Sequence, residues 1–173
     1  MSAQLPASPE KPDPTLWPRQ AGTYALVVQV PAPLQVCIGR LGAPVLSAGW
    51  YVYVGSALGP GGLRGRLARH FRSDKKLRWH IDYVLSSVAA ATQAQPIAQV
   101  WYVCSAVRNE CVWARELGAL PGARVAMRGF GASDCRCPSH LLAFEAFPPF
   151  QLFAQRLSEL GCVKIQRFVY LPG

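Results

Sequence analysis

The 173-residue sequence has few acidic residues and no long apolar segment. No apolar run approaches the ~18 residues that a membrane-spanning helix needs, and no apolar segment with a small-residue cleavage site opens the chain. Six cysteines are too few to form a disulfide scaffold in a chain of this length. We therefore expect a soluble protein of the reducing cytoplasm that makes no membrane contact.

The shortage of acidic residues leaves the chain strongly basic, with 18 Lys and Arg against 9 Asp and Glu and a net charge of +9. Seven of the basic residues lie between Arg64 and Arg78, where Asp74 is the one acid. Such a cluster favours nucleic acid as a partner, because each phosphate contact releases condensed counterions. A solvated basic face that keeps the protein soluble is the alternative.

Hydrophobic residues make up 51% of the chain and include five Trp, which is enough for the core of one domain. Residues 1–20 are rich in Pro and polar side chains, and we expect them to be a flexible leader. The domain is predicted to cover residues 21–144. Residues 145–173 are then a C-terminal extension that packs on the domain or mediates contacts.

Apolar periodicity and Gly or Pro breaks define the expected secondary structure. Strands are predicted at residues 23–30, 34–39, 50–55, 96–105, 141–144 and 163–171. Helices are predicted at residues 63–71, 78–88, 110–117 and 151–160. This order predicts an α+β fold, with a small central antiparallel or mixed sheet flanked by helices.

Two strands carry a tyrosine beside a glycine: "GTY" at 22–24 begins one strand, and "YVG" at 53–55 ends another. A tyrosine at the rim of a sheet can bury its ring while its hydroxyl points into a cleft. Two aromatic core residues beside turn glycines are the alternative.

In the helix "LRGRLARHF", Arg66 and His70 share a face with Leu63 and Leu67 at helical spacing. An inward arginine is costly unless an anion meets it. Either a structural carboxylate or carbonyl, or a bound phosphate, satisfies that requirement. The other arginines of this segment are predicted to face solvent: Arg64, Arg69 and Arg72.

Glu110 opens the helix "ECVWARELG" on its apolar face, with Asn109 as the N-cap. An acid in the first turn is stabilised by the helix dipole, which explains Glu110 without a function. The alternative is one oxygen ligand for Mg²⁺, which commonly binds one or two carboxylates. An inward Arg, an inward Glu and two rim tyrosines together suggest metal-assisted phosphodiester hydrolysis.

The ordered set "GTY", "YVG", "LRGRLARH" and a later helical Glu resembles the GIY-YIG endonuclease superfamily. The stretches "YVYVGSALG", "LRWHIDYVL", "NEC" and "GFGASDCRCPSHL" are similar to a narrower branch of it, known only as a domain of unknown function (DUF123-like). The resemblance covers residues 21–144.

This resemblance implies an α/β sandwich with a cleft in which the catalytic side chains converge. Within that cleft it implies Mg²⁺ or Mn²⁺ on Glu110, a phosphate clamp at Arg66 and a proton-relay tyrosine. The implied catalytic residues are Tyr24, Tyr53, Arg66, His70 and Glu110. The residues that we expect to contact the substrate are Gly55, Ser56, Arg64, Arg69, His80, Asp82 and Ser133.

Asp82 lies in the first turn of the helix that begins in "WHIDY". Stabilisation by the helix dipole explains it, and pairing with Arg66 or His70 is the alternative. Cys135, Cys137 and His140 are spaced too closely for a usual structural Zn²⁺ site, although Cys104 or Cys111 is a conceivable fourth ligand. We expect these cysteines to pack as small hydrophobes in a tight loop beneath the cleft, without Zn²⁺.

The sequence therefore favours a divalent-metal-dependent endonuclease that acts on DNA more than on RNA. A nucleic-acid-binding module that keeps the fold but does not cleave is the alternative. A small zinc-binding interaction domain built on the cysteine loop is a third hypothesis. A Mg²⁺-dependent cleavage assay separates the first two, and metal analysis of the purified protein tests the third.

Overall fold

Two long antiparallel strands, β1 (Gly22–Val30) and β4 (Gly49–Ala57), form the centre of the fold. The computed structural model describes residues 12–161 and 164–170. Four further strands complete an antiparallel sheet in the order β6-β7-β4-β1-β5-β8. Their bounds are Ile97–Cys104 for β5, Arg124–Val125 for β6, Leu141–Phe144 for β7 and Gln166–Val169 for β8.

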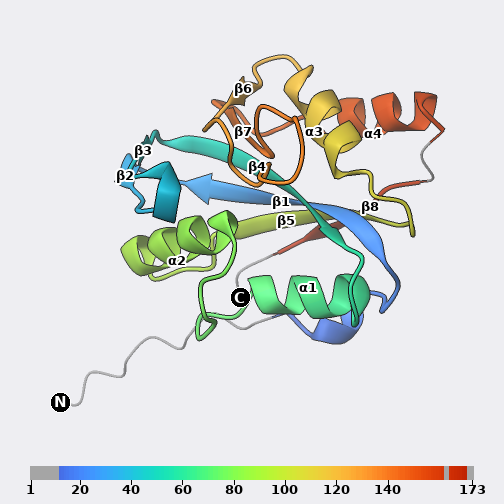
Figure 1. The fold of residues 1–173 in the computed structure, drawn as a ribbon, viewed down its shortest axis with the longest axis horizontal. Helices are drawn as coiled ribbons and strands as arrows, with labels where there is room; N and C mark the ends of the chain where they lie inside the picture. Colours follow the sequence, from blue (N-terminus) through green and yellow to red (C-terminus); the bar gives the residue numbers. More distant parts are fainter. Residues whose placement is uncertain (1–11, 162–163, 171–173) are drawn as a thin grey trace.

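Helices cover both faces of this sheet, so the domain has three layers (Figure 1). The helices α1 (Gly62–His70) and α2 (His80–Thr92) lie on one face, and α3 (Glu110–Gly118) and α4 (Phe150–Glu159) lie on the other. Strand alternation divides the apolar side chains between the layers. Tyr24 and Leu26 join the core under α1 and α2, whereas Ala25 and Val27 join the core under α3 and α4. The predicted α+β fold with an antiparallel sheet is confirmed.

The expected strand at 34–39 is wrong beyond residue 35. The chain forms a two-stranded sheet from β2 (Leu34–Gln35) and β3 (Val45–Leu46), with a 3₁₀ turn η2 (Gly39–Leu41) between them. Val36 and Ile38 are fully buried, and this alternation mimics a strand. The backbone instead turns at Gly39 and Gly42, which both have positive φ. The short strands β3 and β6 were not predicted.

The N-terminal segment joins the domain earlier than expected, because residues 12–20 pack against α1. A 3₁₀ turn η1 (Pro14–Leu16) leads to Trp17, which is 1% exposed and stacks on Phe71 at a ring-centroid distance of 5.3 Å. The N–H of Leu63 donates to the carbonyl of Gln20 at 2.9 Å. A flexible leader over all of 1–20 is therefore wrong for residues 12–20, and residues 1–11 lie outside the described part.

The described residues of the C-terminal region, 145–161 and 164–170, pack on the domain. Phe153 and Leu157 of α4 are fully buried, and the Phe153 ring meets that of Trp113 edge-on at 5.3 Å. Strand β8 then pairs with β5 at the edge of the sheet. In the described part of the chain, every helix is too short or too polar to cross a bilayer.

Candidate active site

The tyrosine of the first tripeptide lies against the glycine of the second. Tyr24 of β1 is in register with Gly55 of β4. A Cβ atom on Gly55 would lie 2.5 Å from the Tyr24 hydroxyl oxygen, so only glycine leaves room for this ring. Tyr53 lies on the same face of the sheet, with its ring centroid 6.5 Å from that of Tyr24. The two tripeptides therefore form one structural unit.

Tyr24 forms a buried hydrogen bond with His70 at the end of α1. The Tyr24 Oη and His70 Nε2 atoms are 2.7 Å apart, and the residues are 1% and 2% exposed. Burial lowers the pKa of His70 well below its usual value, so the imidazole is neutral at neutral pH. Burial likewise raises the pKa of Tyr24 well above its usual value. The pair therefore consists of two neutral groups at neutral pH.

Asp82 approaches the ring nitrogen of His70 that does not face Tyr24. Asp82 Oδ1 lies 4.0 Å from His70 Nδ1, which has no hydrogen-bond partner among the described residues. The negative charge favours the tautomer with its proton on Nδ1, because this proton then points toward the carboxylate. In that tautomer, Nε2 accepts the hydroxyl proton of Tyr24.

Asp82 itself is completely buried within a network of donors. Arg69 donates from Nη1 to Oδ1 and from Nη2 to Oδ2, both at 2.9 Å. The N–H groups of Arg78 and Trp79 donate to Oδ2 at 2.9 and 3.1 Å, and Lys75 Nζ lies 3.8 Å from Oδ1. Burial opposes ionisation, but these donors outweigh it and lower the pKa of Asp82.

Two sequence expectations change at this network. Arg69 was predicted to face solvent, which is wrong: its side chain is 21% exposed and pairs with Asp82. Of the alternative pairing of Asp82 with Arg66 or His70, the structure shows a 4.0 Å approach to His70. The helical pattern placed Arg69 off the leucine face of α1, but α2 supplies a buried carboxylate at that position. Both residues thus stabilise the fold, and their contact with a substrate stays a prediction.

Arg66 is half-buried and stacks on an aromatic ring. Its guanidinium carbon lies 3.9 Å from the ring centroid of Trp79, and that of Arg69 lies 4.1 Å from the same centroid. Among the described residues, no carboxylate lies within ion-pair distance of Arg66. The stacked ring fixes the plane of the guanidinium, and within residues 12–161 and 164–170 no acidic side chain pairs with its donors.

Arg64 has a structural contact of its own. Its Nε donates to the carbonyl of Trp17 at 2.9 Å and so fastens the N-terminal segment to α1. Contact between Arg64 and a substrate stays a prediction.

Glu110 begins α3 and has a buried oxygen that lacks a donor. The residue is 6% exposed, and among the described residues Oε2 has no hydrogen-bond partner. Arg108 Nε lies 3.3 Å from the other oxygen, Oε1. A buried carboxylate oxygen without a partner is costly, and a cation would remove that cost. Glu110 therefore fits the expected role of single carboxylate ligand to Mg²⁺ or Mn²⁺.

The charges of Glu110 and Arg66 both act on the two tyrosines. Burial raises the pKa of Tyr53, Arg66 lowers it, and Glu110 raises it further. The same two charges act in the same directions on Tyr24. The structure thus brings Tyr24, Tyr53 and His70 together, and the charges of Arg66 and Glu110 act on the two tyrosines. A single catalytic site formed by all five residues stays a prediction.

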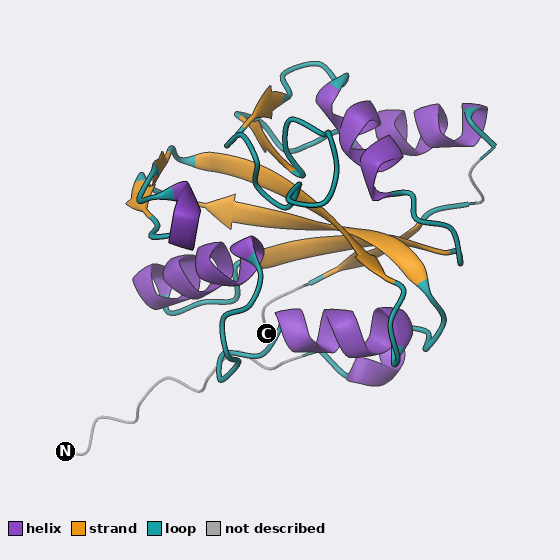
Figure 2. Cartoon of the chain, in the orientation of Figure 1, coloured by secondary structure: helices purple, strands orange, loops and turns teal. Residues whose placement is uncertain are grey.

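The loop of residues 126–140 connects β6 to β7 and lies beside β4 (Figure 2). His80 Nδ1 accepts a hydrogen bond from the N–H of Gly131 at 3.1 Å, and Phe130 packs edge-on against Tyr53 at 5.9 Å. The hydrogen bond from Gly131 therefore attaches this loop to His80 at the start of α2. Ser133 is exposed on this loop and Ser56 is half-buried at the end of β4, so their contact with substrate stays a prediction.

A second group of side chains meets beside Glu110. One ligand atom from each of Cys111, Cys135, Cys137 and His140 lies within 4.8 Å of every other. Cys135 Sγ lies 3.4 Å and Cys111 Sγ 3.9 Å from His140 Nε2. Burial and then the neighbouring thiols raise the pKa of Cys137 to about 12. The three cysteines are only half-buried and face one another, so they do not pack as separate small hydrophobes.

A profile of the family described as "Domain of unknown function DUF123" matches residues 23–162. The chain belongs to the DUF123 family. No curated protein and no solved structure matches the chain. The DUF123 match includes the tyrosines, α1, Glu110 and the whole cysteine group, and it extends past residue 144 to include α4.

Three residues of this DUF123 site were missed in the sequence. Trp79 supports two arginines, Lys75 Nζ donates to the carbonyl of His70 at 2.7 Å, and Arg108 approaches Glu110. Burial lowers the pKa of Lys75 to about 8. Lys75 lies within a run of basic residues, so its position in the sequence did not distinguish it. Arg108, two residues before Glu110, could have been identified from the sequence as a partner of that carboxylate.

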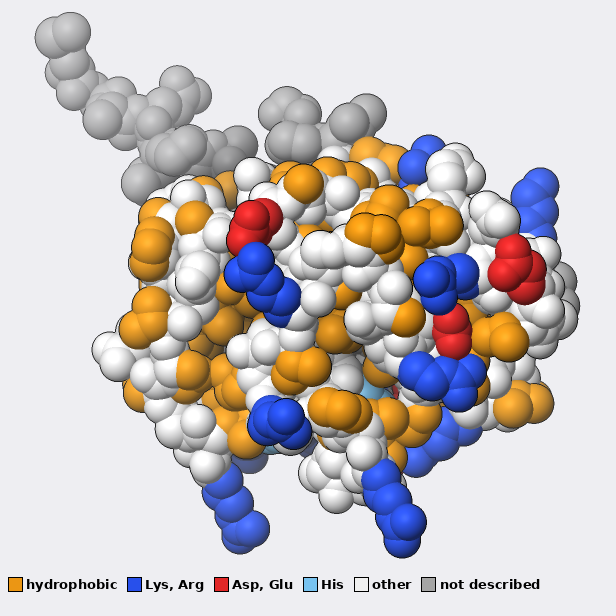
Figure 3. Space-filling view, turned by 90° about the horizontal axis from the view of Figure 1, so that it is seen from above, with side chains coloured by type: hydrophobic (Ala, Val, Ile, Leu, Met, Phe, Trp, Pro, Cys, Tyr) orange, Lys and Arg blue, Asp and Glu red, His pale blue; other side chains and the backbone are white. Residues whose placement is uncertain are grey.

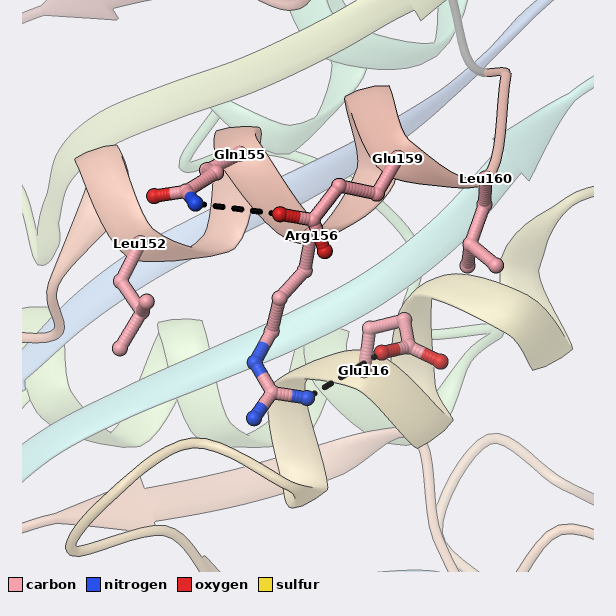
Figure 4. A pocket seen from close by; sticks show the side chains of 6 residues that line it. All are labelled: Glu116, Leu152, Gln155, Arg156, Glu159 and Leu160. Atoms are coloured by element: carbon pink, nitrogen blue, oxygen red, sulfur yellow. Dashed lines mark hydrogen bonds and ion pairs between the residues drawn. The ribbon is translucent and has the colours of Figure 1, made fainter.

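The DUF123 domain also has a pocket between α3 and α4, away from these residues. Figure 4 shows the side chains that line it: Glu116, Leu152, Gln155, Arg156, Glu159 and Leu160. An ion pair between Arg156 and Glu116 crosses it at 3.5 Å. The face seen from above carries separate basic side chains, some beside acidic ones, and no continuous basic patch (Figure 3). The basic segment 64–78 belongs to α1 and the chain that follows it, on the opposite side of the sheet.

Proposed function

We propose that this DUF123 domain is a GIY-YIG-type endonuclease that uses a divalent metal ion to hydrolyse phosphodiester bonds, with DNA as the favoured substrate. The observation that carries the proposal is the Glu110 carboxylate: among the described residues its buried Oε2 has no hydrogen-bond partner, and its charge, like that of Arg66, acts on Tyr24 and Tyr53. A buried carboxylate together with two tyrosines and a stacked arginine fits this chemistry best.

Arg66 binds the scissile phosphate. Its planar fork of donors matches two phosphate oxygens, and stacking on Trp79 holds the fork in one orientation before the substrate arrives. Because no carboxylate of the described chain competes for it, Arg66 meets the charge that develops on the phosphate. The exposed side chains of Lys76 and Arg78 add to the positive field that attracts a polyanion.

The Tyr24–His70 pair accepts the proton of the attacking water. The water gives a proton to Tyr24 Oη while Tyr24 gives its own proton to His70 Nε2, so no free phenolate forms. This relay suits a phenol whose pKa burial has raised and an imidazole that burial keeps neutral. The water oxygen then bonds to phosphorus as the bond to the leaving oxygen breaks, and the leaving alkoxide takes a proton from solvent water.

A Mg²⁺ or Mn²⁺ ion on Glu110 would supply charge stabilisation to the phosphate and the leaving oxygen. Arg108 holds the other carboxylate oxygen at 3.3 Å, and so leaves Oε2 for that ion. Tyr53 lies on the same face of the sheet as Tyr24.

The test is a cleavage assay with labelled DNA duplexes, junctions, flaps and single strands, and with RNA, in Mg²⁺ or EDTA. We expect Mg²⁺-dependent products, and Glu110→Gln should lower the rate by about 100-fold or more. Glu116→Gln is the matched control, because Glu116 lies on the same helix but pairs with Arg115 and Arg156. The cleavage rate of Tyr53→Phe is measured in parallel and shows whether the Tyr53 hydroxyl takes part in the reaction.

Two outcomes contradict the proposal. Binding without cleavage of any substrate would favour the non-catalytic nucleic-acid-binding module. Cleavage that Glu110→Gln and Glu116→Gln reduce equally would show that the activity does not use this site.

A further inference from the structure

The four-residue group at the start of α3 has the composition of a structural metal site. It contains three thiols and one imidazole, drawn from Cys111 of α3 and from Cys135, Cys137 and His140 of the loop before β7. Sulfur and nitrogen ligands in this proportion select Zn²⁺ over Mg²⁺, Mn²⁺ or Ca²⁺, which prefer oxygen. This group is therefore distinct in chemistry from the Glu110 site.

Its geometry fits a tetrahedron. With Zn–S bonds of about 2.3 Å and Zn–N bonds of about 2.0 Å, a sulfur and a nitrogen on one tetrahedral zinc lie about 3.5 Å apart. The observed distances from His140 Nε2 are 3.4 Å to Cys135 Sγ and 3.9 Å to Cys111 Sγ. All four ligand atoms lie within 4.8 Å of one another, so one ion can reach them with small side-chain adjustments.

We propose that Cys111, Cys135, Cys137 and His140 bind one structural Zn²⁺ that fastens the 126–140 loop to the start of α3. Four protein ligands fill the tetrahedral coordination and leave no position for substrate, which is typical of structural rather than catalytic zinc. The short Cys-x-Cys spacing argued against zinc in the sequence. The fold compensates because the fourth ligand comes from another element.

The backbone around the site shows what the zinc would hold in place. The N–H of His140 donates to the carbonyl of Phe130 at 2.7 Å, and the N–H of Val54 in β4 donates to the carbonyl of His140 at 2.9 Å. Gly131 packs so closely on Tyr53 that an added Cβ would lie 3.1 Å from its ring. Cys111 follows Glu110 directly. The zinc site thus connects the wall around Tyr53 with the helix end that carries Glu110.

The test measures zinc in the full-length protein purified without added metal or chelator. We expect about one zinc per chain, falling below about 0.1 in Cys135→Ser and in Cys137→Ser. Cys37→Ser and Cys104→Ser are the matched controls, because both side chains are exposed and lie outside the group. The controls should retain the zinc of the wild type.

Two further measurements keep the proposal testable if the serine variants do not fold. Wild-type protein in which Co²⁺ replaces zinc should show thiolate-to-metal charge transfer that saturates at about one Co²⁺ per chain. Hydrogen exchange should accelerate in the 126–140 loop and at the start of α3 when a chelator removes the metal. Neither readout depends on cleavage, so failure here is distinguishable from failure of the proposed nuclease.

Three results would overturn the proposal. The first is metal-free protein that takes up neither zinc nor Co²⁺ with thiolate bands. The second is iron in place of zinc, and the third is a disulfide among Cys111, Cys135 and Cys137 that persists under denaturing alkylation.

Discussion

Replacing Asp82 by Asn should destabilise the protein far more than any exposed charge change. Asn has nearly the same shape as Asp, so the packing around this fully buried side chain is preserved. The negative charge is lost, and an NH₂ group replaces one acceptor oxygen. Either the Arg69 donor or the backbone donors of Arg78 and Trp79 then face another donor.

The magnitude follows from the burial of the pair. Arg69 is 21% exposed and the Lys75 side chain is 4% exposed, so neither cation recovers full hydration when the carboxylate is removed. Removing one partner of a buried ion pair costs about 3–5 kcal/mol. Because domains of this kind have about 5–15 kcal/mol of total stability, the variant approaches the limit of folding.

Urea denaturation followed by circular dichroism measures this loss at pH 7. With a slope of about 2 kcal/mol per molar urea, the midpoint should fall by roughly 1.5–2.5 M. Glu145→Gln is the control, since Glu145 pairs with Arg124 at 2.7 Å while the two side chains are 80% and 73% exposed. That change should cost about 0.5 kcal/mol or less. A loss below about 1 kcal/mol in Asp82→Asn would refute the reasoning.

The pH dependence of stability in acid tests the same carboxylate, and the lowered pKa of Asp82 fixes the direction of the expected change. The folded-state pKa of Asp82 is lower than its ordinary value, so the unfolded chain binds this proton more readily. The stabilisation is present above the ordinary carboxyl pKa of about 3.9, and it is lost as pH falls through the lower folded-state pKa. Asp82→Asn should remove this part of the acid destabilisation. An unchanged acid limb would contradict the assignment.

Two further predictions concern the Tyr24–His70 pair. Gly55→Ala should displace the Tyr24 ring, because the new Cβ would lie 2.5 Å from the hydroxyl oxygen. Both the melting temperature and any cleavage activity should therefore fall. Gly65→Ala in α1 is the control: its Cβ would lie 3.9 Å from the nearest atom, so activity should be unchanged and stability unchanged or slightly higher. The pKa of His70 is lowered by burial, so the unfolded chain binds its proton more readily and the free energy of unfolding should fall as pH drops below about 6.5. His70→Gln should flatten this slope in urea titrations at pH 5 and 7.5, and a slope equal to the wild type would contradict the burial argument.

The secondary structure was largely predictable because the sequence is locally consistent. The alternating apolar residues of β1 and β4 and the helical spacing in α1 and α3 each agree with the final fold. The wrong prediction of a strand at 34–39 arose because the local pattern and the final fold disagree there. There, burial of Val36 and Ile38 against the rest of the domain produced an alternation that the backbone does not follow.

The sequence could not predict contacts in which the partner side chain comes from a second helix or loop. Helical spacing correctly placed His70 and Glu110 on inward faces, but it could not show that α2 directs Asp82 toward Arg69. Cys111 is similar: it lies 24 positions before Cys135, and only the packing of α3 beside the loop brings the two together. Periodicity reports which face is buried, whereas partners depend on tertiary packing.

The position of the proposed site follows from the point along β4 at which its pairing with β7 ends. Tyr24, Tyr53 and His70 belong to one face of the sheet, whereas α3 with Glu110 packs on the other. A fully paired sheet would separate them. Strand β7, however, pairs with β4 only from Trp50 to Tyr53, and beyond this point, within the described residues, the backbone contact is to the loop carbonyl at position 140. At this edge of β4, where β7 no longer pairs, the charge of Glu110 in one layer acts on the tyrosines of the other. The proposed catalytic site therefore depends on β7 starting late and on the 126–140 loop occupying the remaining edge, which is the loop that the cysteine group fastens to α3.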